Sequence, residues 1–265
     1  MELPQYSLDE YNEIYDVDYT LSMSQKCIQF LNRYYFRAEM VGKEKIPERQ
    51  PGESPHIYVG NHSGFAFAWD GIVFGSVHAY RHYYKPEKLL RGLVHPLTLF
   101  RQEMNPFLIK DWWIKGGGVD SSLRTFEAMM HQHQDLVIYP EGVAGIAKGF
   151  DKRYQIQNMS ASFVRMALKF NAKIIPVLTV NGEYLNPYSY KSDLLNEIAQ
   201  KIGMTFLPMA GTTAILPFQP WALYGGLPAK LTYVVGDPID LNEFTEGKPF
   251  KEIRKKEQHA LRDLV

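Results

Sequence analysis

The chain alternates short apolar runs with segments whose apolar residues recur every three or four positions. Buried strands are predicted where a run is rich in β-branched residues, at 57–59, 135–139 and 173–180. Helices are predicted where the helical spacing dominates, at 70–79, 123–130 and 162–171. Strands that alternate with helices pair in parallel and carry helices on both faces of the sheet. The pattern therefore predicts an α/β fold whose mixed, mostly parallel sheet is flanked by helices.

The N-terminal residues are predicted to form an amphipathic helical arm. From about residue 19 to 36, apolar side chains follow helical spacing, and polar or basic side chains occupy the other faces. Such an arm either packs on the domain or lies on a bilayer, and the pattern is compatible with both. We therefore predict two units, the arm at 1–37 and one α/β domain at 38–265, a length that a single domain can fill.

Two local features qualify the predicted strands. Pro176 lies inside the third run, and because proline lacks the N–H that a strand interior needs, it indicates a sheet edge or a bulge. The glycines at 116–118 predict a turn. The segment 183–228 is proline-rich and is predicted to be irregular apart from a helix near 192–202, and a last strand is predicted at 230–235.

Composition narrows the class of protein. With 45% hydrophobic and 22% charged residues, the sequence is typical of a globular protein. Lys plus Arg and Asp plus Glu number 29 each, so the formal charge is zero, which argues against nucleic acid as a partner. The single cysteine excludes an intramolecular disulfide and a cysteine-rich zinc site, and it fits a reducing compartment. No run approaches the ~20 apolar residues of a membrane-spanning helix, and the acidic start does not resemble a signal peptide, so a cytoplasmic protein is expected.

Aromatic residues are unusually frequent, with 17 Tyr, 15 Phe and 4 Trp in 265 residues. Several stand beside basic residues, as in the segments 32–37 and 80–85. This mixture suits a membrane interface, and it also fits an aromatic core with a solvated rim. We expect peripheral membrane association through the arm and these segments, and the sequence makes no prediction about oligomeric state.

A histidine directly follows the first predicted strand. A glycine and an asparagine end that strand, so His62 is expected at the carboxyl edge of the sheet, where α/β proteins usually bind ligands. Asp70 lies a little downstream and can fold back on the imidazole. A histidine held by a carboxylate is the usual general base near neutral pH. We therefore predict His62 and Asp70 as the catalytic pair. Its neighbours predicted to bind substrate are Asn61, Ser63 and Gly64.

A second polar group follows the strand at 135–139, and therefore lies at the same edge of the sheet. Glu141 and Gly142 come first, and further glycines at 145 and 149 are expected to leave backbone N–H groups free for an anion or oxyanion. Lys148 and Arg153 are candidate partners for phosphate, Arg153 with its planar fork. The substrate-binding residues predicted here are Glu141, Gly142, Lys148 and Arg153.

Three blocks occur in the order found in a known family. They are Asn61-His62 with Asp70, then Tyr139-Pro140-Glu141-Gly142, then Ile175-Pro176-Val177. They resemble the Asn-His-x4-Asp, Phe-Pro-Glu-Gly and Val-Pro-Val blocks of the lysophospholipid (glycerolipid) acyltransferase superfamily, over roughly residues 38–245. The His-Ser-Gly form of the first block looks like a divergent branch that includes enzymes acting on neutral glycerides. Seven residues separate His62 from Asp70 where the family has four, and the family's arginines after Glu-Gly and in its middle block are missing.

The resemblance implies a glycerolipid acyltransferase-like fold and an O-acyltransferase. His62 would take the proton of an acceptor hydroxyl, Asp70 would fix its tautomer, and Glu141 would position the acceptor hydroxyls. The donor would be acyl-CoA or an acyl-carrier protein as co-substrate, and the acceptor a glycerolipid or lysophospholipid hydroxyl, with no cofactor. The displaced arginines leave open whether the acceptor carries a phosphate.

Two other functions fit the same residues. One is a non-catalytic lipid-binding protein on the same fold, and the other is an acyl-thioester hydrolase in which water replaces the alcohol. No metal site is predicted, because the histidine pairs His78 with His82 and His131 with His133 lack a third ligand.

Overall fold

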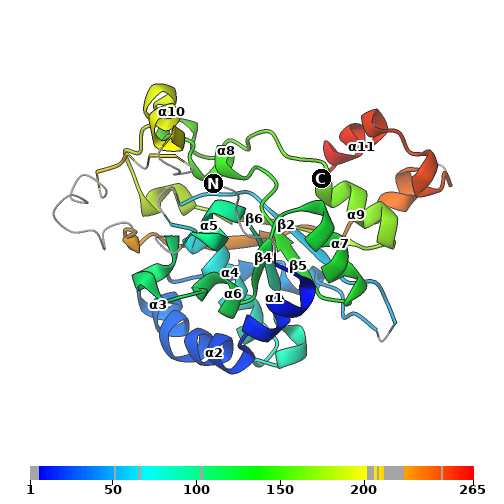
Figure 1. Cartoon of the computed structure of the whole chain (residues 1–265), viewed down its shortest axis with the longest axis horizontal. Helices are drawn as coiled ribbons and strands as arrows, with labels where there is room; N and C mark the ends of the chain where they lie inside the picture. Colours follow the sequence, from blue (N-terminus) through cyan, green and yellow to red (C-terminus); the bar gives the residue numbers. More distant parts are fainter. Residues whose placement is uncertain are drawn as a thin grey trace.

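A computed structural model describes residues 6–50, 52–64, 67–101, 104–201, 206–207, 209–211, 224–245 and 247–265. Its centre is a seven-stranded sheet in the order β1-β7-β6-β2-β5-β3-β4, with helices on both sides (Figure 1). The strands are β1 Glu39–Val41, β2 Ile57–Gly60, β3 Arg91–Val94, β4 Gly118–Asp120, β5 Leu136–Ile138, β6 Ile174–Val180 and β7 Thr232–Val235.

Five neighbouring strands of the sheet, from β6 to β4, run parallel. β7 pairs antiparallel with β6, and β1 pairs parallel with β7, so these two run the other way. This confirms the predicted α/β fold with a mixed, mostly parallel sheet.

The helices fill the connections between strands. They are α1 Leu8–Ile14, α2 Val17–Ser22, α3 Gln29–Tyr34, α4 Trp69–Arg81, α5 Pro96–Phe100, α6 Trp112–Lys115, α7 Leu123–His131, α8 Val143–Ile146, α9 Ser162–Phe170, α10 Asp193–Lys201 and α11 Lys255–Arg262, with a π-helix at Met23–Ile28. Single 3-10 turns lie at Lys43–Lys45, Pro86–Lys88, Pro106–Leu108, Phe150–Lys152, Gly182–Leu185, Leu241–Phe244 and Phe250–Glu252. No helix within the described residues is long and apolar enough to cross a membrane.

The sheet separates two hydrophobic layers. In β2, Ile57 and Val59 point into the layer built by α1, α7, α9 and α11, whereas Tyr58 points into the layer that contains α4. Phe126 and Phe163 are fully buried in the first layer, and Phe74 in the second. Because both faces of the central strands are covered, these strands read as continuous apolar runs.

The N-terminal helices pack against α4. The segment predicted as one helix is divided into α2, the π-helix and α3, and the Ser24 and Asn32 side chains both donate to the hydroxyl of Ser76 on α4, at 2.8 and 3.4 Å. On the outer side, Phe30 and Tyr34 are 61% and 63% exposed. The arm therefore contacts the domain through one face and presents aromatic rings on another.

Pro176 lies in the interior of the sheet, at a bulge. β6 is a central strand, so the edge position that proline indicated is wrong and the bulge is right. Val177 pairs with Val235, but Ile174 pairs with Ile239. The segment 235–239, which pairs with β6, therefore carries one extra residue opposite the proline. The sheet bulges where the proline has no N–H to donate, which is a position at which a sheet tolerates proline.

The glycine-rich turn gives way to a strand that the sequence did not predict. β4 begins at Gly118 and pairs with β3. A Cβ on Gly118 would lie 2.7 Å from the carbonyl oxygen of Trp113, so this glycine permits a close approach of two backbone segments. Further along, α10 agrees with the helix predicted near 192–202, whereas much of the predicted irregular segment lies outside the described residues, including 212–223.

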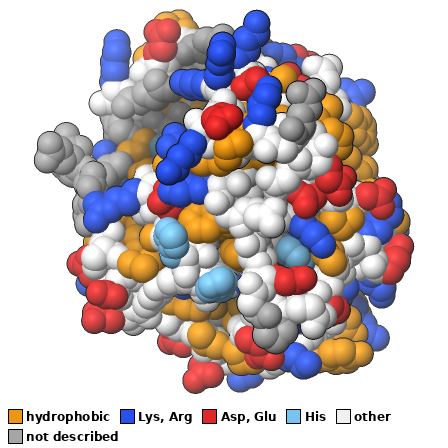
Figure 2. Space-filling model, turned by 90° about the vertical axis from the view of Figure 1, so that its right-hand side faces the viewer, with side chains coloured by type: hydrophobic (Ala, Val, Ile, Leu, Met, Phe, Trp, Pro, Cys, Tyr) orange, Lys and Arg blue, Asp and Glu red, His pale blue; other side chains and the backbone are white. Residues whose placement is uncertain are grey.

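Charge is unevenly distributed over this neutral chain. On the face that carries α11 in Figure 1, lysine and arginine side chains gather in the upper half, and acidic side chains are more frequent in the lower half (Figure 2). A formal charge of zero therefore hides local basic surfaces.

Candidate active site

His62 lies in the loop that leaves the carboxyl end of β2. The preceding residue, Asn61, fixes this loop to the neighbouring strand, because its side chain donates to the carbonyl oxygen of Thr179 at 3.1 Å and accepts from the Thr179 N–H at 2.6 Å. Asn61 is buried. The sequence predicted Asn61 as a substrate-binding residue. In the structure both the nitrogen and the oxygen of its amide bind the backbone of β6, and these bonds position the histidine loop.

His62 and Asp70 form a short hydrogen bond. The Nδ1 atom of His62 lies 2.7 Å from Oδ2 of Asp70, whose side chain is fully buried, while the imidazole is 14% exposed. With Nδ1 turned to the carboxylate, Nε2 is the ring nitrogen left to meet a substrate. The same geometry holds the tautomer that carries its proton on Nδ1.

The Asp70 carboxylate is fixed by backbone donors on both sides. Its Oδ2 also accepts the N–H of Ser63 at 2.8 Å, and its Oδ1 accepts the N–H of Gly71 at 2.9 Å. Asp70 is the second residue of α4, where the positive end of the helix dipole favours a carboxylate. The buried anion is therefore both oriented and compensated.

Tyr139 supports the imidazole from one side. Its ring stacks on that of His62 with centroids 4.7 Å apart and an interplanar angle of 26°. The ring fits between two glycines, since a Cβ on Gly60 would lie 2.7 Å and one on Gly71 3.3 Å from Tyr139 atoms. Burial raises the pKa of the Tyr139 hydroxyl well above its usual value, so the phenol stays neutral. The sequence had shown this residue only as the first position of the second block.

Glu141 connects the histidine loop to a distant segment of the chain. One carboxylate oxygen accepts the backbone N–H of His62 at 2.7 Å, and the other accepts the backbone N–H of Gln157 at 2.5 Å. The residue is 4% exposed. Burial raises the pKa of the carboxyl, although the two N–H donors and then Lys148 act in the opposite direction. Glu141 thus holds His62 in place through the backbone.

The glycines after Glu141 serve the turn itself. Gly142 adopts φ +55° and ψ −137°, a conformation that only glycine adopts readily. The Gly142 N–H donates to the carbonyl oxygen of Tyr139, and the Gly145 N–H donates to that of Gly142. The sequence had suggested that these N–H groups are free for an anion, but both are bound within the turn. A Cβ on Gly145 would come within 3.0 Å of the Cβ atoms of both Glu141 and His62, so this glycine allows the turn to lie over the site.

Lys148 is buried and paired. Its Nζ lies 3.0 Å from Oε1 of Glu183 and donates to the carbonyl oxygen of Gln155 at 2.9 Å, with the lysine and glutamate side chains 2% and 6% exposed. The phosphate contact predicted for Lys148 is thus replaced by an internal ion pair. Arg153 remains exposed, and its guanidinium lies 4.9 Å from the centre of the Phe150 ring.

Ser63 and Gly64 complete the loop. The Ser63 hydroxyl is buried against Gly182, where an added Cβ would overlap it. Gly64 has φ +111°, and its carbonyl oxygen accepts from Asn186 at 2.6 Å. Gly182, Glu183 and Asn186 all belong to the segment after β6. The sequence predicted residues 183–228 to be irregular, and the only local signal was the Asn181-Gly182 dipeptide, which favours a turn.

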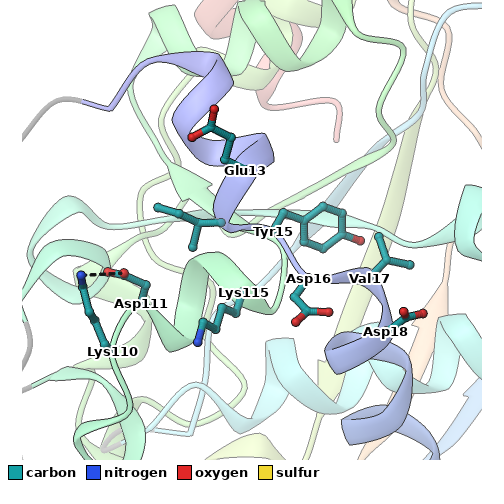
Figure 3. Close-up of a pocket in the computed structure, with 9 residues that line it drawn as sticks. Glu13, Tyr15, Asp16, Val17, Asp18, Lys110, Asp111 and Lys115 are labelled. Carbon is teal, nitrogen blue, oxygen red and sulfur yellow. Dashed lines mark ion pairs between the residues drawn. The ribbon is translucent and has the colours of Figure 1, made fainter.

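An open cavity of about 680 Å³ lies elsewhere, between α1, α2 and the segment around α6 (Figure 3). Glu13, Asp16 and Asp18 face it together with Lys115 and the ion pair of Lys110 with Asp111. It shares no lining residue with the His62 site. Among the described residues, no group of three or more His, Cys, Asp or Glu side chains is arranged to hold a metal ion.

Comparisons with known proteins find relatives of this chain by sequence. No family model matches the chain. Uncharacterized proteins of Mycobacterium tuberculosis and Mycobacterium leprae are 24% and 25% identical over 243 and 246 residues, which is 88% and 90% of this chain. The chain spans about 60% of the length of these relatives.

A solved structure resembles the fold. It is the 1-acyl-sn-glycerophosphate (LPA) acyltransferase PlsC from Thermotoga maritima, which aligns with a TM-score of 0.50 at 13% identity over 94% of this chain and 76% of the other. The protein therefore has an acyltransferase-like α/β fold, with the His62–Asp70 pair at the carboxyl edge of its sheet.

Proposed function

We propose that the protein is an O-acyltransferase that moves an acyl chain from a thioester donor to a lipid hydroxyl. The observation that carries this proposal is the 2.7 Å contact between His62 Nδ1 and the buried Asp70 carboxylate, with the imidazole still partly exposed. A neutral imidazole in this setting is a general base for a hydroxyl group. The fold shared with an LPA acyltransferase supports the same class of reaction.

The reaction is direct transfer to the acceptor. Nε2 of His62 takes the proton of the acceptor hydroxyl while its oxygen attacks the thioester carbonyl carbon. The tetrahedral intermediate collapses with cleavage of the C–S bond, and the imidazolium returns the proton to the leaving thiolate. Asp70 stabilises the imidazolium between the two steps, and no acyl-enzyme forms.

The proposed substrates are those that the family resemblance implies. The donor is acyl-CoA or an acyl-carrier protein, which supplies the thioester without any cofactor. The acceptor is a glycerolipid or lysophospholipid hydroxyl. Since Lys148 is bound to Glu183, Arg153 is the candidate left from the sequence analysis for a phosphate on that acceptor. We place the enzyme in the cytoplasm at a membrane surface, and the exposed rings of Phe30 and Tyr34 are suited to that contact.

The test is thiol release from a panel of acyl-CoAs, with and without lysophospholipid, glycerol phosphate, monoacylglycerol or diacylglycerol. The protein is compared with His62→Ala, and with His131→Ala as a matched control at a histidine with an exposed side chain. Release that requires an acceptor and is lost in His62→Ala alone is the expected result. Release without acceptor identifies a hydrolase instead. A folded protein that binds liposomes but releases no thiol with any pair contradicts the enzyme proposal and favours a lipid-binding protein.

A further inference from the structure

A second polar cavity lies at the far end of α4 from Asp70. α4 has thirteen residues and is therefore about 20 Å long, with Asp70 in its first turn and Arg81 as its last residue. The cavity measures about 340 Å³ and is lined by Glu48, Arg81, His82, Tyr83, Lys85 and Lys88. It lies beside the start of β3, at the edge of the sheet opposite to the catalytic pair.

Positive charge dominates this cavity. Arg81, Lys85 and Lys88 face a single carboxylate, that of Glu48, which lies 3.4 Å from the Lys88 ammonium. Burial alone would raise the pKa of Glu48, but the Lys88 ammonium, and then Arg81, bring it below its usual value. Three permanent cations against one anion leave a net charge of plus two.

The guanidinium of Arg81 is held without a carboxylate. It donates to Nε2 of His82 at 2.7 Å and to the carbonyl oxygen of Ile46 at 3.4 Å. Burial, and then Arg81, lower the pKa of His82, so the ring is a neutral acceptor. The His82 ring is packed on that of His78, 4.7 Å away. Within the described residues neither Arg81 nor Lys85 forms an ion pair, so their charge is available to a ligand.

The backbone beside the cavity is strained. Tyr83 and Tyr84 have φ of +54° and +56°, two consecutive non-glycine residues in the left-handed region. Each costs about 1 to 2 kcal/mol relative to a relaxed residue. The resulting turn brings Lys85 back beside the end of α4, where Tyr84 N–H reaches the Ala79 carbonyl oxygen at 2.7 Å. Strain of this kind persists mainly where it positions functional groups.

Helix capping explains only part of this arrangement. Cations near a helix C-terminus interact well with its dipole, which accounts for Arg81 and His82. Lys85 and Lys88 come after the helix, in the strained turn and the 3-10 turn that follows, and yet they line the same cavity. We propose that this cavity binds the phosphate group of an anionic ligand, with the charged Arg81 guanidinium and the two ammonium groups as its partners. The site is separate from the proposed acyl transfer and does not depend on it.

The experiment measures calorimetric binding of pyrophosphate to the full chain at low ionic strength, without any acyl donor. Arg81→Ala combined with Lys85→Ala is expected to weaken binding by at least about tenfold, because two charge-assisted contacts are lost. Glu48→Gln is expected to tighten binding severalfold, since it removes the only carboxylate among the described residues that line the cavity. A change in this direction cannot come from unfolding. Lys251→Gln with Lys255→Gln, at two exposed lysines of the C-terminal segment, is the charge-matched control and should bind as the unaltered protein does.

A parallel arm distinguishes the two sources of a phosphate group. The same variants are sedimented with two kinds of vesicle, one of phosphatidylcholine alone and one that also contains about 20% phosphatidate. Dependence on Arg81 and Lys85 with vesicles but not with pyrophosphate assigns a lipid headgroup, and dependence with pyrophosphate assigns a soluble ligand. Equal binding by all variants, equal loss in the control, or no binding of either probe overturns the proposal.

Discussion

Glu141→Gln separates two roles for the central carboxylate. The sequence suggested that Glu141 positions acceptor hydroxyls, whereas the structure shows both of its oxygens accepting backbone N–H groups. A glutamine retains one acceptor oxygen and places an NH2 group against the other N–H. The variant therefore loses one charge-assisted hydrogen bond and leaves two donors facing each other.

The magnitude follows from these contacts. A hydrogen bond to a charged group contributes about 1.5 to 3 kcal/mol, and an unsatisfied buried donor costs about 1 to 3 kcal/mol. Burial disfavours the ionised carboxyl, as its raised pKa indicates, so the neutral glutamine recovers part of this cost. A net loss of about 2 kcal/mol in the free energy of unfolding is expected. Since Glu141 holds the His62 backbone, a shift of the imidazole by a fraction of an ångström should lower kcat by about 10 to 100-fold.

The assay combines urea unfolding with steady-state kinetics in which the acceptor concentration is varied. The expected result is a lower unfolding midpoint and a lower kcat, with the acceptor KM nearly unchanged. Gln157→Ala is the control, because it keeps the backbone N–H that Glu141 binds and should change neither quantity. Unchanged stability and kcat with an acceptor KM raised tenfold would refute the structural role and restore the acceptor-binding one.

Three further predictions concern buried groups around the site and the core. Lys148→Met and Glu183→Gln should each destabilise the protein by about 3 to 5 kcal/mol, and the double variant by less than their sum, in a double-mutant cycle by urea unfolding. Gly182→Ala should cost about 1 to 3 kcal/mol and most of the activity, because the new Cβ overlaps the Ser63 hydroxyl. Burial keeps the pKa of His78 well below 6.5, so the unfolded state binds a proton that the folded state does not, and stability falls as pH drops below 6.5. When the pH is lowered from 7.5 to 5.5, the free energy of unfolding should therefore fall by about 1.4 kcal/mol more in the unaltered protein than in His78→Gln.

Each of these predictions has an outcome that contradicts it. Additive single effects would mean that Lys148 and Glu183 do not act as a pair. Gly75→Ala, on α4 with no atom within 4 Å of the new Cβ, should stabilise the protein by about 0.5 to 1 kcal/mol, and an equal loss at both glycines would remove the steric argument. Identical pH profiles for the protein and His78→Gln would show that His78 does not titrate differently on unfolding.

The sequence predicted the parts of the fold that depend on local pattern. Continuous apolar runs marked β2, β5 and β6, and the same reasoning located His62 and Glu141 at one edge of the sheet. Strand β4 was missed because its three residues begin with a glycine that suggested a turn, and its place is decided by pairing with β3. Pro176 was compatible with a sheet edge or a bulge. The choice depends on the paired segment 235–239, which has an extra residue opposite the proline and is far away in the sequence.

The contacts that build the site were harder to predict because their partners are far apart in sequence. Lys148 and Glu183 lie on loops that follow different strands, and nothing local in either loop specifies the other. The same holds for the Glu141 carboxylate. One of its oxygens accepts the backbone N–H of Gln157, which lies sixteen residues further along the chain. A cation after a glycine-rich turn has the same sequence signature whether it faces a phosphate or a buried glutamate. The sequence thus identifies residues that can carry chemistry. It does not tell which of them form internal contacts that stabilise the fold.

The distance of Asp70 from His62 in sequence shows the converse. Seven residues separate them instead of the family's four, which by spacing alone weakens the assignment of the pair. In the structure the position of the carboxylate is set by the start of α4, where Gly71 N–H binds one oxygen, and by the beginning of the loop, where Ser63 N–H binds the other. The two ends of the loop are therefore fixed to the same carboxylate. Any number of intervening residues that allows both bonds leaves the His62–Asp70 contact intact, so the constraint lies on the helix start and not on the count of residues.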